Sequence, residues 1–421
     1  MAVGTSAVVD ESRFAKVKAA PSGGAFSLAA EYQLDTDPRK VDLLIGAYRD
    51  DNAKPWQLPS AIEAKRQINI EAQSHEYLPL QGNPNFLQAS QELVFGPKIL
   101  EQEVSAIASI QTVSGTGANS LIAQFLQRHT TPRDVWLPNP TWANHPDIWA
   151  TNAPGVRVKF YPYYDATNKK FDFAGLMLEL QTKPQERDAI LFHACAHNPT
   201  GIDPTHDQWR QIALLCKAKK LFVIFDLAYQ GFASGNLDLD AWAIRHFLTH
   251  REIEMAVCQS FSKNLGLYGE RTGALHLVVS RNTPSQSAVV IQNHLTNIHR
   301  ATLRFGSEVA TAILATEDLR QMWKDDLVAM SGRIKEMRQA LYDELLRLRA
   351  PGSWEHIVEQ TGMFSYLGLN VDQVEVLRKE YHVYMLPCGR VSICGLTTAN
   401  VKYVARAIDK LVRSSFVQSI N

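Results

Sequence analysis

A single lysine, Lys263, lies in a short polar stretch where its amine is placed to act as a nucleophile. The run before it, residues 253–257, is mostly apolar and indicates a buried strand. A lysine just past the end of such a strand is desolvated, which favours its neutral, nucleophilic form. Ser260 and Arg271 flank it with a hydroxyl and a fixed cation, which is typical of a site that holds an anion beside the amine. A plain solvated turn has the same pattern, so this interpretation depends on the rest of the chain.

A second stretch, Ser114-Gly-Thr-Gly117, is placed to bind an anion. It follows the apolar run 108–113 and opens an expected helix. Small residues such as Ser114, Gly115 and Thr116 let backbone N–H groups approach an anion, and the helix dipole favours phosphate there. A tight turn between a strand and a helix explains the two glycines equally well. The spacing matches neither a Walker loop nor the Gly-x-Gly-x-x-Gly motif.

Asp226 ends the strongly apolar run 221–225. A carboxylate at this point requires a cationic or N–H partner, because burying it bare is costly. Capping the segment that follows is one role for it. Pairing with a protonated ring nitrogen of a ligand is the other, and Tyr229, three residues on, can direct its phenol at the same ligand.

His193 and His197 raise the question of a metal site. They span a strand end and a proline turn, so the two rings need not converge, and no third ligand is apparent. We therefore expect no metal. Asn198, directly before Pro199, is better placed as a hydrogen-bond donor to a ligand, although an ordinary Asn-Pro turn has the same sequence.

Trp142 and Arg390 complete the set of candidate ligand-binding residues. Trp142 follows another strand end, where an indole either packs locally or stacks on a flat ring. Arg390 lies in the C-terminal region, where its planar fork can clamp a carboxylate, although singly it would be assigned to the surface. A phosphate cradle, an amine nucleophile, a buried carboxylate, a stacking ring and a carboxylate clamp together suit pyridoxal phosphate acting on an amino acid.

The elements that must position these residues alternate between strand and helix. Amphipathic helical stretches such as 121–128 and 208–219 lie between short β-rich runs. The strands are expected at residues 108–113, 134–138, 157–162, 188–193, 221–226, 253–258 and 274–279. This alternation predicts an α/β fold: a mostly parallel seven-stranded sheet with helices on both faces, and ligands beyond the carboxyl ends of the strands.

Three parts of the chain are expected. Residues 1–24 mix small and polar types and predict an N-terminal arm without a core of its own. Residues 55–324 predict a large domain that binds the cofactor. Residues 25–54 and 325–421 predict a second, smaller α/β domain, joined to the large one through a long amphipathic helix at 319–348.

The composition excludes several function classes. Among 421 residues, Lys plus Arg and Asp plus Glu are both 43, so no nucleic-acid or membrane-surface partner is indicated. No run of about 18 apolar residues predicts a membrane span. Five scattered cysteines fit a reducing compartment. Residues 1–18 include acidic residues and have no apolar core of a signal peptide, so a cytoplasmic location is expected.

Several longer motifs make the sequence recognisable. They are His75-Glu-Tyr-Leu-Pro79, Ser114-Gly-Thr-Gly117, residues 193–205, residues 226–235, Gln259-Ser-Phe-Ser-Lys-Asn264, Gly362-Met-Phe-Ser365 and Gly389-Arg390. With these motifs the chain resembles the fold-type I, class I aminotransferases of the eukaryotic aspartate aminotransferase type. The resemblance covers nearly the whole chain, from about Asp37 to the last helix.

The resemblance implies a transaminase that depends on pyridoxal 5'-phosphate, with Lys263, Asp226 and Tyr229 as catalytic residues. Lys263 binds the cofactor covalently and, once released by the substrate, acts as general acid and base. Asp226 keeps the pyridine nitrogen protonated, while Tyr229 and Asn198 hydrogen-bond the ring oxygen. Trp142 covers the ring and also borders the substrate.

The resemblance further implies how the anionic groups are bound. Residues that hold the cofactor phosphate are Ser114, Gly115, Thr116, Ser260 and Arg271, with Tyr77 arriving from the partner subunit. Arg390, with Gly46 and Asn198 nearby, takes the substrate α-carboxylate. The family is homodimeric with shared active sites, and its substrates are L-amino acids and 2-oxo acids, here aspartate and glutamate.

One departure concerns the substrate side chain. The family has an arginine that crosses from the other subunit to bind a side-chain carboxylate, followed shortly by an Asn-Pro-Pro element. Counting from the motifs on either side places Thr296 or Asn297 at that position, and the element is absent. Arg300, which we include among the candidate substrate-binding residues, or Arg304 substitutes only if the loop is rebuilt. Losing a bidentate charge pair weakens discrimination in favour of dicarboxylic acids.

Two alternatives stand beside transamination. A related enzyme with a repurposed pocket would condense, eliminate or cyclise a different amino acid in a specialised biosynthetic pathway. A non-catalytic binding protein on the same fold is the other alternative, and the presence of Lys263, Asp226 and Arg390 argues against it.

Overall fold

A computed structural model of the chain describes residues 15, 25–70, 76–280, 283–284, 286–299 and 303–420. Apart from Ala15, the predicted N-terminal arm at residues 1–24 lies outside the described residues. So do His75, the first residue of one of the motifs, and Arg300.

The centre of the structure is a seven-stranded sheet in the order β2-β10-β9-β8-β7-β3-β4. Its strands are β2 (Ile107–Val113), β3 (Asp134–Asn139), β4 (Arg157–Pro162), β7 (Ala189–His193), β8 (Phe222–Leu227), β9 (Met255–Ser260) and β10 (Thr272–Val278). Only β10 runs against its neighbours β2 and β9; the other pairs are parallel. All seven strands were predicted from the sequence, with ends that agree to within two residues.

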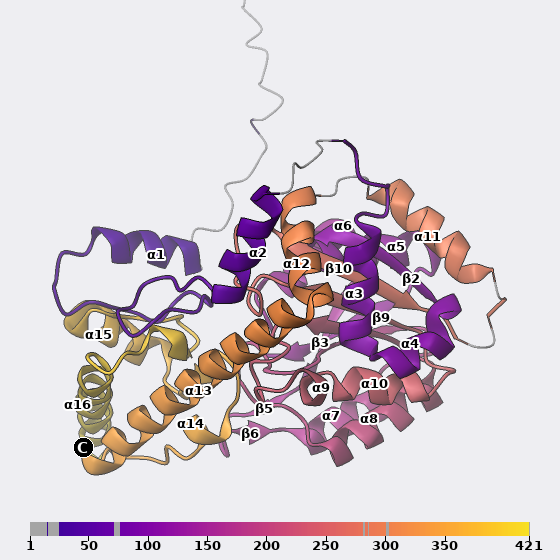
Figure 1. The fold of residues 1–421 in the computed structure, drawn as a ribbon. Coiled ribbons are helices and arrows are strands. Elements are labelled where there is room, and N and C mark those ends of the chain that lie inside the picture. Colours follow the sequence, from indigo (N-terminus) through magenta and orange to yellow (C-terminus); the bar gives the residue numbers. More distant parts are fainter. Residues whose placement is uncertain are drawn as a thin grey trace, which may run out of the picture.

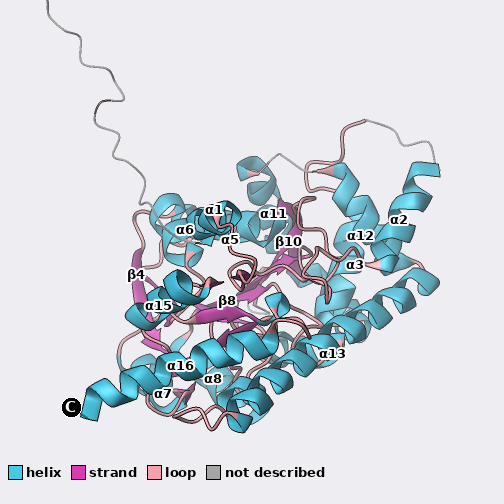
Figure 2. Cartoon of the chain, turned by 90° about the vertical axis from the view of Figure 1, so that its left-hand side faces the viewer, coloured by secondary structure: helices cyan, strands magenta, loops and turns pink. Residues whose placement is uncertain are grey.

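Apolar side chains alternate between the two faces of this sheet, so each face carries its own core. On β7, Ile190 and Phe192 belong to one hydrophobic cluster, whereas Ala189 and Leu191 belong to the other. Helix α8 covers the first face through Trp209. Figure 2 shows the strands between α5 and α11 on one side and α8 on the other. The predicted fold, with helices on both faces of a mostly parallel sheet, is therefore confirmed.

Eleven helices of the described residues accompany this sheet. They are α2 (Pro59–Ile70), α3 (Pro84–Phe95), α4 (Pro97–Glu103), α5 (Ser114–His129), α6 (Asn144–Asn152), α7 (Phe173–Thr182), α8 (His206–Lys219), α9 (Leu237–Asp240), α10 (Trp242–Thr249), α11 (Ser287–Ile298) and α12 (Arg304–Ala315). A 3₁₀ turn at Val104–Ala106 precedes β2, and a small antiparallel pair, β5 (Tyr164–Asp165) and β6 (Lys170–Phe171), follows β4.

The C-terminal part of the chain gathers at one side of the molecule together with α1 (Figure 1). Its elements are α13 (Glu317–Arg347), α14 (His356–Glu359), β11 (Phe364–Tyr366), α15 (Val371–Tyr381), β12 (Val383–Tyr384), β13 (Arg390–Ser392), a 3₁₀ turn at Ile393–Gly395 and α16 (Val401–Ile420). The long helix α13 contacts both α16 at this side and α2 beside the sheet.

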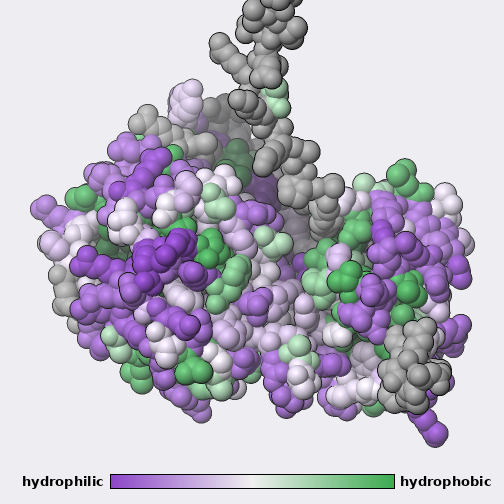
Figure 3. Space-filling view, turned by 180° about the vertical axis from the view of Figure 1, so that it is seen from behind, coloured by the Kyte–Doolittle hydropathy of each residue, from purple (hydrophilic) through white to green (hydrophobic). Residues whose placement is uncertain are grey.

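The segment around α1 (Ala25–Leu34) joins this C-terminal part through backbone pairing. Strand β1 (Val41–Asp42) pairs in parallel with β12. The surface seen from behind mixes hydrophilic side chains with small hydrophobic patches, as in Figure 3. Such a mixture is usual for a globular chain with balanced charges.

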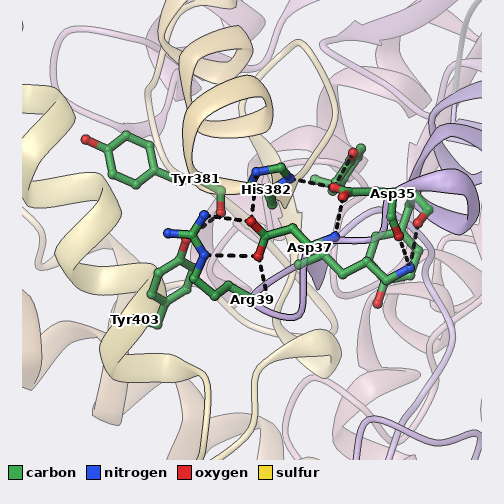
Figure 4. Close-up of polar contacts among 9 residues, drawn as sticks. Asp35, Asp37, Arg39, Tyr381, His382 and Tyr403 are labelled. Carbon is green, nitrogen blue, oxygen red and sulfur yellow. Dashed lines mark hydrogen bonds and ion pairs between the residues drawn. The ribbon is translucent and has the colours of Figure 1, made fainter.

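Polar contacts reinforce the pairing of β1 with β12, as Figure 4 shows. The Asp35 carboxylate bonds His382 Nδ1 at 2.7 Å and accepts from Tyr384 Oη at 2.8 Å. The other ring nitrogen of His382 lies 3.2 Å from the Asp37 carboxylate, which also accepts from Arg39 Nε at 3.0 Å. Main-chain and side-chain hydrogen bonds, first that from the Asp37 N–H, lower the pKa of Asp35 from 3.8 to about 2.

This depressed pKa predicts an acid-sensitive contribution to folding. Because the folded value lies below the unfolded one, the contribution is complete above pH 3.8 and is lost as the pH falls towards about 2. We expect Asp35→Asn to lower the free energy of unfolding at pH 7 and to leave a smaller difference from wild type at pH 3. Urea titrations at both pH values measure it, with Asp343→Asn, on the exposed face of α13, as the control. An equal deficit at both pH values would contradict the assignment.

Candidate functional site

A cavity opens beyond the carboxyl ends of the parallel strands. It is lined by Ser114, Gly115, Thr116, Trp142, His193, Asn198, Asp226, Ala228, Tyr229, Ser260, Lys263 and Arg271. Ten of these residues are candidates from the sequence, and they lie at the ends of five different strands or in the segments that follow them. The structure therefore brings them to one place, which is where ligands collect in sheets of this type.

Lys263 lies on the wall of this cavity, with its Nζ atom 5.4 Å from the centre of the Tyr229 ring. Burial lowers the pKa of its amine, and the nearby cations Arg271 and Arg390 lower it further, while Asp226 opposes them. A lowered pKa raises the fraction of neutral amine at physiological pH, so Lys263 has the character of a nucleophile.

Asp226 is a buried carboxylate at the end of β8, and its partners are two side chains that our sequence analysis did not single out. Its Oδ2 atom bonds His145 Nε2 at 2.9 Å and Asn119 Nδ2 at 3.3 Å. Burial raises the pKa of Asp226, but the bond from His145 and the surrounding charges outweigh it, and the net shift is downward. The carboxylate therefore stays ionised in a buried place.

A chain of side chains continues from His145 beneath the cavity. Its Nδ1 lies 2.8 Å from Thr141 Oγ1, which lies 3.3 Å from His193 Nε2. Burial lowers the pKa of His193 to about 3, so this ring is neutral. One feature of the sequence could have indicated His145: it lies shortly after the candidate Trp142, close to the start of α6.

Our expectation that His193 and His197 need not converge is wrong. Their ring centres lie 4.2 Å apart, and His197 stacks on Tyr163 at 3.8 Å. The turn after β7 makes this possible, because Ala196 adopts a φ of +50° and returns the chain towards the strand end. Both rings are buried among side chains, and no group of three metal-ligating side chains occurs within the part of the chain that is described.

A cluster of hydroxyl groups and a guanidinium forms one end of the cavity. Ser114 Oγ lies 3.1 Å from Ser260 Oγ and 2.8 Å from Ser262 Oγ, which also accepts from Arg271 Nη1 at 3.3 Å. Helix α5 begins at Ser114 without a side-chain cap. The Ser114 N–H donates to the Arg271 carbonyl at 2.9 Å, which leaves the N–H groups that follow it for a ligand. A Cβ at Gly115 would lie 3.1 Å from Ser260 Cβ, so glycine keeps the cradle open.

These residues fit the phosphate and the ring nitrogen of pyridoxal phosphate. Three hydroxyls, one guanidinium and a helix N-terminus suit a dianionic phosphate, whereas no carboxylate belongs to that cluster. On Asp226, the hydrogen bonds of the described residues reach Oδ2 and leave Oδ1 for a ligand. Ser262 was missing from our sequence candidates although it lies between Ser260 and Lys263.

Arg390 lies on β13, only 7% exposed, beside the Asn198 wall of the cavity. Its Nη1 donates to Asn198 Oδ1 at 3.3 Å and its Nη2 to the Leu44 carbonyl at 2.5 Å, while the guanidinium lies 4.1 Å from the centre of the Phe364 ring. Its hydrogen bonds within the described ranges go to an amide oxygen and a main-chain carbonyl, with no carboxylate among these partners, and Nε is buried without a partner. Such a cation is available to an anionic ligand.

Gly46 contributes to this arrangement through its lack of a side chain. A Cβ at this position would lie 2.5 Å from the tip of the Phe364 ring. Glycine therefore allows Phe364 to occupy its place under the Arg390 guanidinium. Tyr229 packs edge-on against the same ring, with centroids 5.9 Å apart, and burial raises the pKa of its phenol.

The remaining candidates lie away from the cavity. The Tyr77 side chain is 94% exposed. Arg304 is engaged locally, because its Nη1 bonds Glu308 at 2.9 Å and its Nη2 the Glu76 carbonyl at 2.6 Å. Thr296 lies on α11 and donates to the Asn293 carbonyl at 2.9 Å.

No described helix is both long and apolar enough to cross a membrane.

The chain matches a protein-family model described as aminotransferase class I and II over residues 38–408. It is 47% identical to the L-tyrosine:2-oxoglutarate aminotransferase ucdG of Aspergillus ustus over 91% of this chain and 75% of that protein. It is 43% identical to the cytoplasmic aspartate aminotransferase of Schizosaccharomyces pombe over 95% of this chain and 98% of that protein.

Solved structures give the same picture. The cytoplasmic aspartate aminotransferase of Saccharomyces cerevisiae superposes with a TM-score of 0.92 at 39% identity, covering 96% of this chain and 99% of that one. The aromatic-amino-acid aminotransferase of Burkholderia pseudomallei, a structure with covalently bound pyridoxal phosphate, has a TM-score of 0.90 at 31% identity, covering 95% and 100%.

Proposed function

The chain belongs to the aminotransferase class I and II family, and from this premise we propose that Lys263, Asp226 and Tyr229 are its catalytic residues. It is a pyridoxal-phosphate-dependent transaminase that exchanges an amino group between an L-amino acid and a 2-oxo acid. The enzyme class, the cofactor and the family expected from the sequence are thus confirmed. The relatives do not favour a repurposed pocket with another reaction, because those named above are aminotransferases.

The observation that carries the proposed roles is the meeting of three groups in one cavity: the Lys263 amine, the Asp226 carboxylate and the hydroxyl cradle around Ser114. When bound, the cofactor supplies an aldehyde that takes up the amino group and a ring that withdraws electrons from the substrate. Lys263, whose pKa is lowered by burial, attaches the cofactor and then moves a proton at the substrate α-carbon.

The other residues hold and orient the cofactor. Asp226, kept ionised by His145, accepts a hydrogen bond from a protonated ring nitrogen through its free oxygen. Tyr229 and Asn198 donate to the ring oxygen, and Trp142 covers the ring from the wall of the cavity. The phosphate lies among Ser114, Gly115, Thr116, Ser260 and Arg271, to which we add Ser262 because it bonds both Ser114 and Arg271.

Arg390 takes the α-carboxylate that amino acids and 2-oxo acids share. For the side chain we propose an aromatic L-amino acid, because Thr296 or Asn297 stands where aspartate enzymes place an arginine and Arg304 is engaged with Glu308. The tyrosine aminotransferase named above supports this choice. Aspartate and glutamate are the second candidate, which the names of the yeast relatives favour.

A homodimer is part of the proposal, with Tyr77 reaching the cofactor phosphate of the other subunit. Tyr77, Leu80 and Leu303 are exposed on neighbouring segments, which the bond from Arg304 to the Glu76 carbonyl ties together. An exposed apolar surface of this kind suits a second copy of the chain. Sedimentation equilibrium tests it, and a monomer at all concentrations would contradict it.

The division into domains and the location in the cell are also proposals. Pairing of β1 with β12 supports a small domain made of residues 25–54 and 325–421 beside a large domain at 55–324. The name of the Schizosaccharomyces pombe relative supports a cytoplasmic location, which cell fractionation tests.

The first test concerns the substrate. We expect kcat/KM for L-tyrosine and L-phenylalanine to exceed that for L-aspartate by at least about tenfold, because Thr296 carries no charge and Arg304 is already engaged with Glu308. The conversion of the cofactor from its aldehyde to its amine form, followed by absorbance, measures each amino acid. A preference for aspartate would move the substrate to the second candidate.

Lys263→Ala is expected to abolish turnover for every amino acid while the protein still binds the cofactor without a covalent bond. Retention of the cofactor after borohydride treatment and denaturation measures the covalent attachment. Near-normal turnover in this variant would contradict the assignment of Lys263.

A further test concerns Ser262. Replacing it with alanine removes a hydroxyl that bonds both Ser114 and Arg271, a loss of about 1 kcal/mol or a weakening of cofactor binding by roughly fivefold. The dissociation constant of pyridoxal phosphate, measured by fluorescence titration of the cofactor-free protein, gives the result. Ser414→Ala, on the exposed face of α16, is the control, and unchanged affinity in Ser262→Ala would remove it from the phosphate site.

A further inference from the structure

Arg338 is a buried arginine on α13 that bonds main-chain carbonyls in place of a carboxylate. Arg338 is only 2% exposed. Nη1 donates to the Ile357 carbonyl at 2.9 Å, and Nη2 donates to the carbonyls of Thr361 at 3.2 Å, Gly362 at 2.9 Å and Phe364. Within the described part of the chain, Arg338 has no ion-pair partner. Burial lowers its pKa to about 9, which leaves it cationic at neutral pH.

All four carbonyls belong to residues 357–364, which we call the linking segment. Its last residue, Phe364, places its ring 4.1 Å from the Arg390 guanidinium. The strand that begins there pairs with β13, so that Tyr366 lies opposite Arg390. The position of Arg390 therefore depends on the linking segment through both a ring contact and a strand register.

The linking segment also holds the loop that carries Asn198. The Thr361 N–H donates to the Gly201 carbonyl at 2.6 Å, and the Thr361 hydroxyl donates to Asp203 Oδ2 at 3.2 Å. Asp203 in turn accepts from the Ala196 N–H at 2.6 Å. The contact is close, because a Cβ at Gly362 would lie 2.4 Å from Ala196 Cβ.

Arg390 and Asn198 bond each other at 3.3 Å, although one lies on β13 and the other in the loop after β7. Arg390 and the loop of Asn198 both contact the linking segment, whose carbonyls accept hydrogen bonds from Arg338. We infer that Arg338 is a positioning residue for the substrate α-carboxylate: its guanidinium fixes the linking segment and, through Phe364 and the Asn198 loop, the geometry of the Arg390 clamp. This inference rests on the proposed role of Arg390.

The type of side chain follows from the geometry. Four carbonyls from one segment converge on two nitrogens of a planar fork, which has five N–H donors in fixed directions. A lysine ammonium keeps the charge but has only three donors on one atom. Arg338→Lys therefore separates the role of the fork from the role of the charge.

The test compares substrates with and without the carboxylate in purified, cofactor-loaded enzyme. We expect Arg338→Lys to raise KM for an amino acid substrate and for its 2-oxo acid by about tenfold while kcat changes by less than about threefold, because binding of the carboxylate is weakened in ground and transition states alike. The amine that lacks only the carboxylate should react with the cofactor at the wild-type rate. Arg413→Lys, which also loses donors to main-chain carbonyls but lies on α16, is the control and should match wild type.

Phe364→Leu provides a second variant that acts at the other end of the linking segment. It should reproduce the rise in KM, so the inference is still decided if Arg338→Lys does not fold. A slower reaction of the carboxylate-free amine or weaker cofactor binding in Arg338→Lys would show a general structural role and overturn the inference. So would an unchanged KM in Arg338→Lys, or in Phe364→Leu where the first variant does not fold.

Arg390→Lys, measured in parallel, distinguishes this failure from a failure of the proposed function. If Arg390→Lys raises KM for the carboxylate substrates and Arg338→Lys does not, only the inference about Arg338 falls. If Arg390→Lys leaves KM unchanged, the proposed clamp is wrong, and the inference falls with it.

Discussion

The site depends on one buried charge, the Asp226 carboxylate at the end of β8. An unpaired carboxylate in the interior would take up a proton, which would remove its ability to stabilise a cation. His145 on α6 and Asn119 on α5 prevent this by bonding Oδ2. Because both helices lie on the same side of the sheet and each follows a different strand, their placement is a consequence of the doubly wound fold. The fold thus supplies hydrogen-bond partners for a charge that water would otherwise have to solvate.

Much of the fold could be predicted from the sequence, because buried parallel strands are continuous apolar runs. Residues 221–226 show this, since both the strand and the carboxylate at its end are visible in the sequence. The partners of that carboxylate were not visible, because Asn119 and His145 lie 107 and 81 positions away from Asp226. Ser262 was missed for a local reason, because the direction of each hydroxyl in that turn depends on the backbone. Single residues at strand ends can be predicted, whereas the networks that join them cannot.

The proposed carboxylate clamp shows the same limit more strongly. Arg390 contacts the Leu44 carbonyl, Asn198 and the Phe364 ring, so three distant segments meet at one guanidinium. The sequence indicated Arg390 and Asn198 by their residue types and positions, and Gly46 by resemblance alone. It gave no reason for Gly46, which became clear only when a Cβ there was found to meet Phe364. Nor did it indicate Arg338, because an arginine within a long amphipathic helix is normally assigned to its solvated face.

The charges around the cavity suit ligands that carry two anionic groups. Burial is the main cause that lowers the pKa of Lys263; the cations Arg271 and Arg390 lower it further, and the Asp226 carboxylate opposes them. In the proposed binding mode, a phosphate beside Arg271 and a carboxylate at Arg390 would neutralise these two cations. Neither anion is the amino-acid side chain, which means that this balance selects the cofactor and the α-carboxylate but leaves the side chain unspecified. Specificity for that side chain therefore has to come from residues outside this charge balance, and we propose the segment around Thr296, where the resemblance places the arginine of the aspartate enzymes.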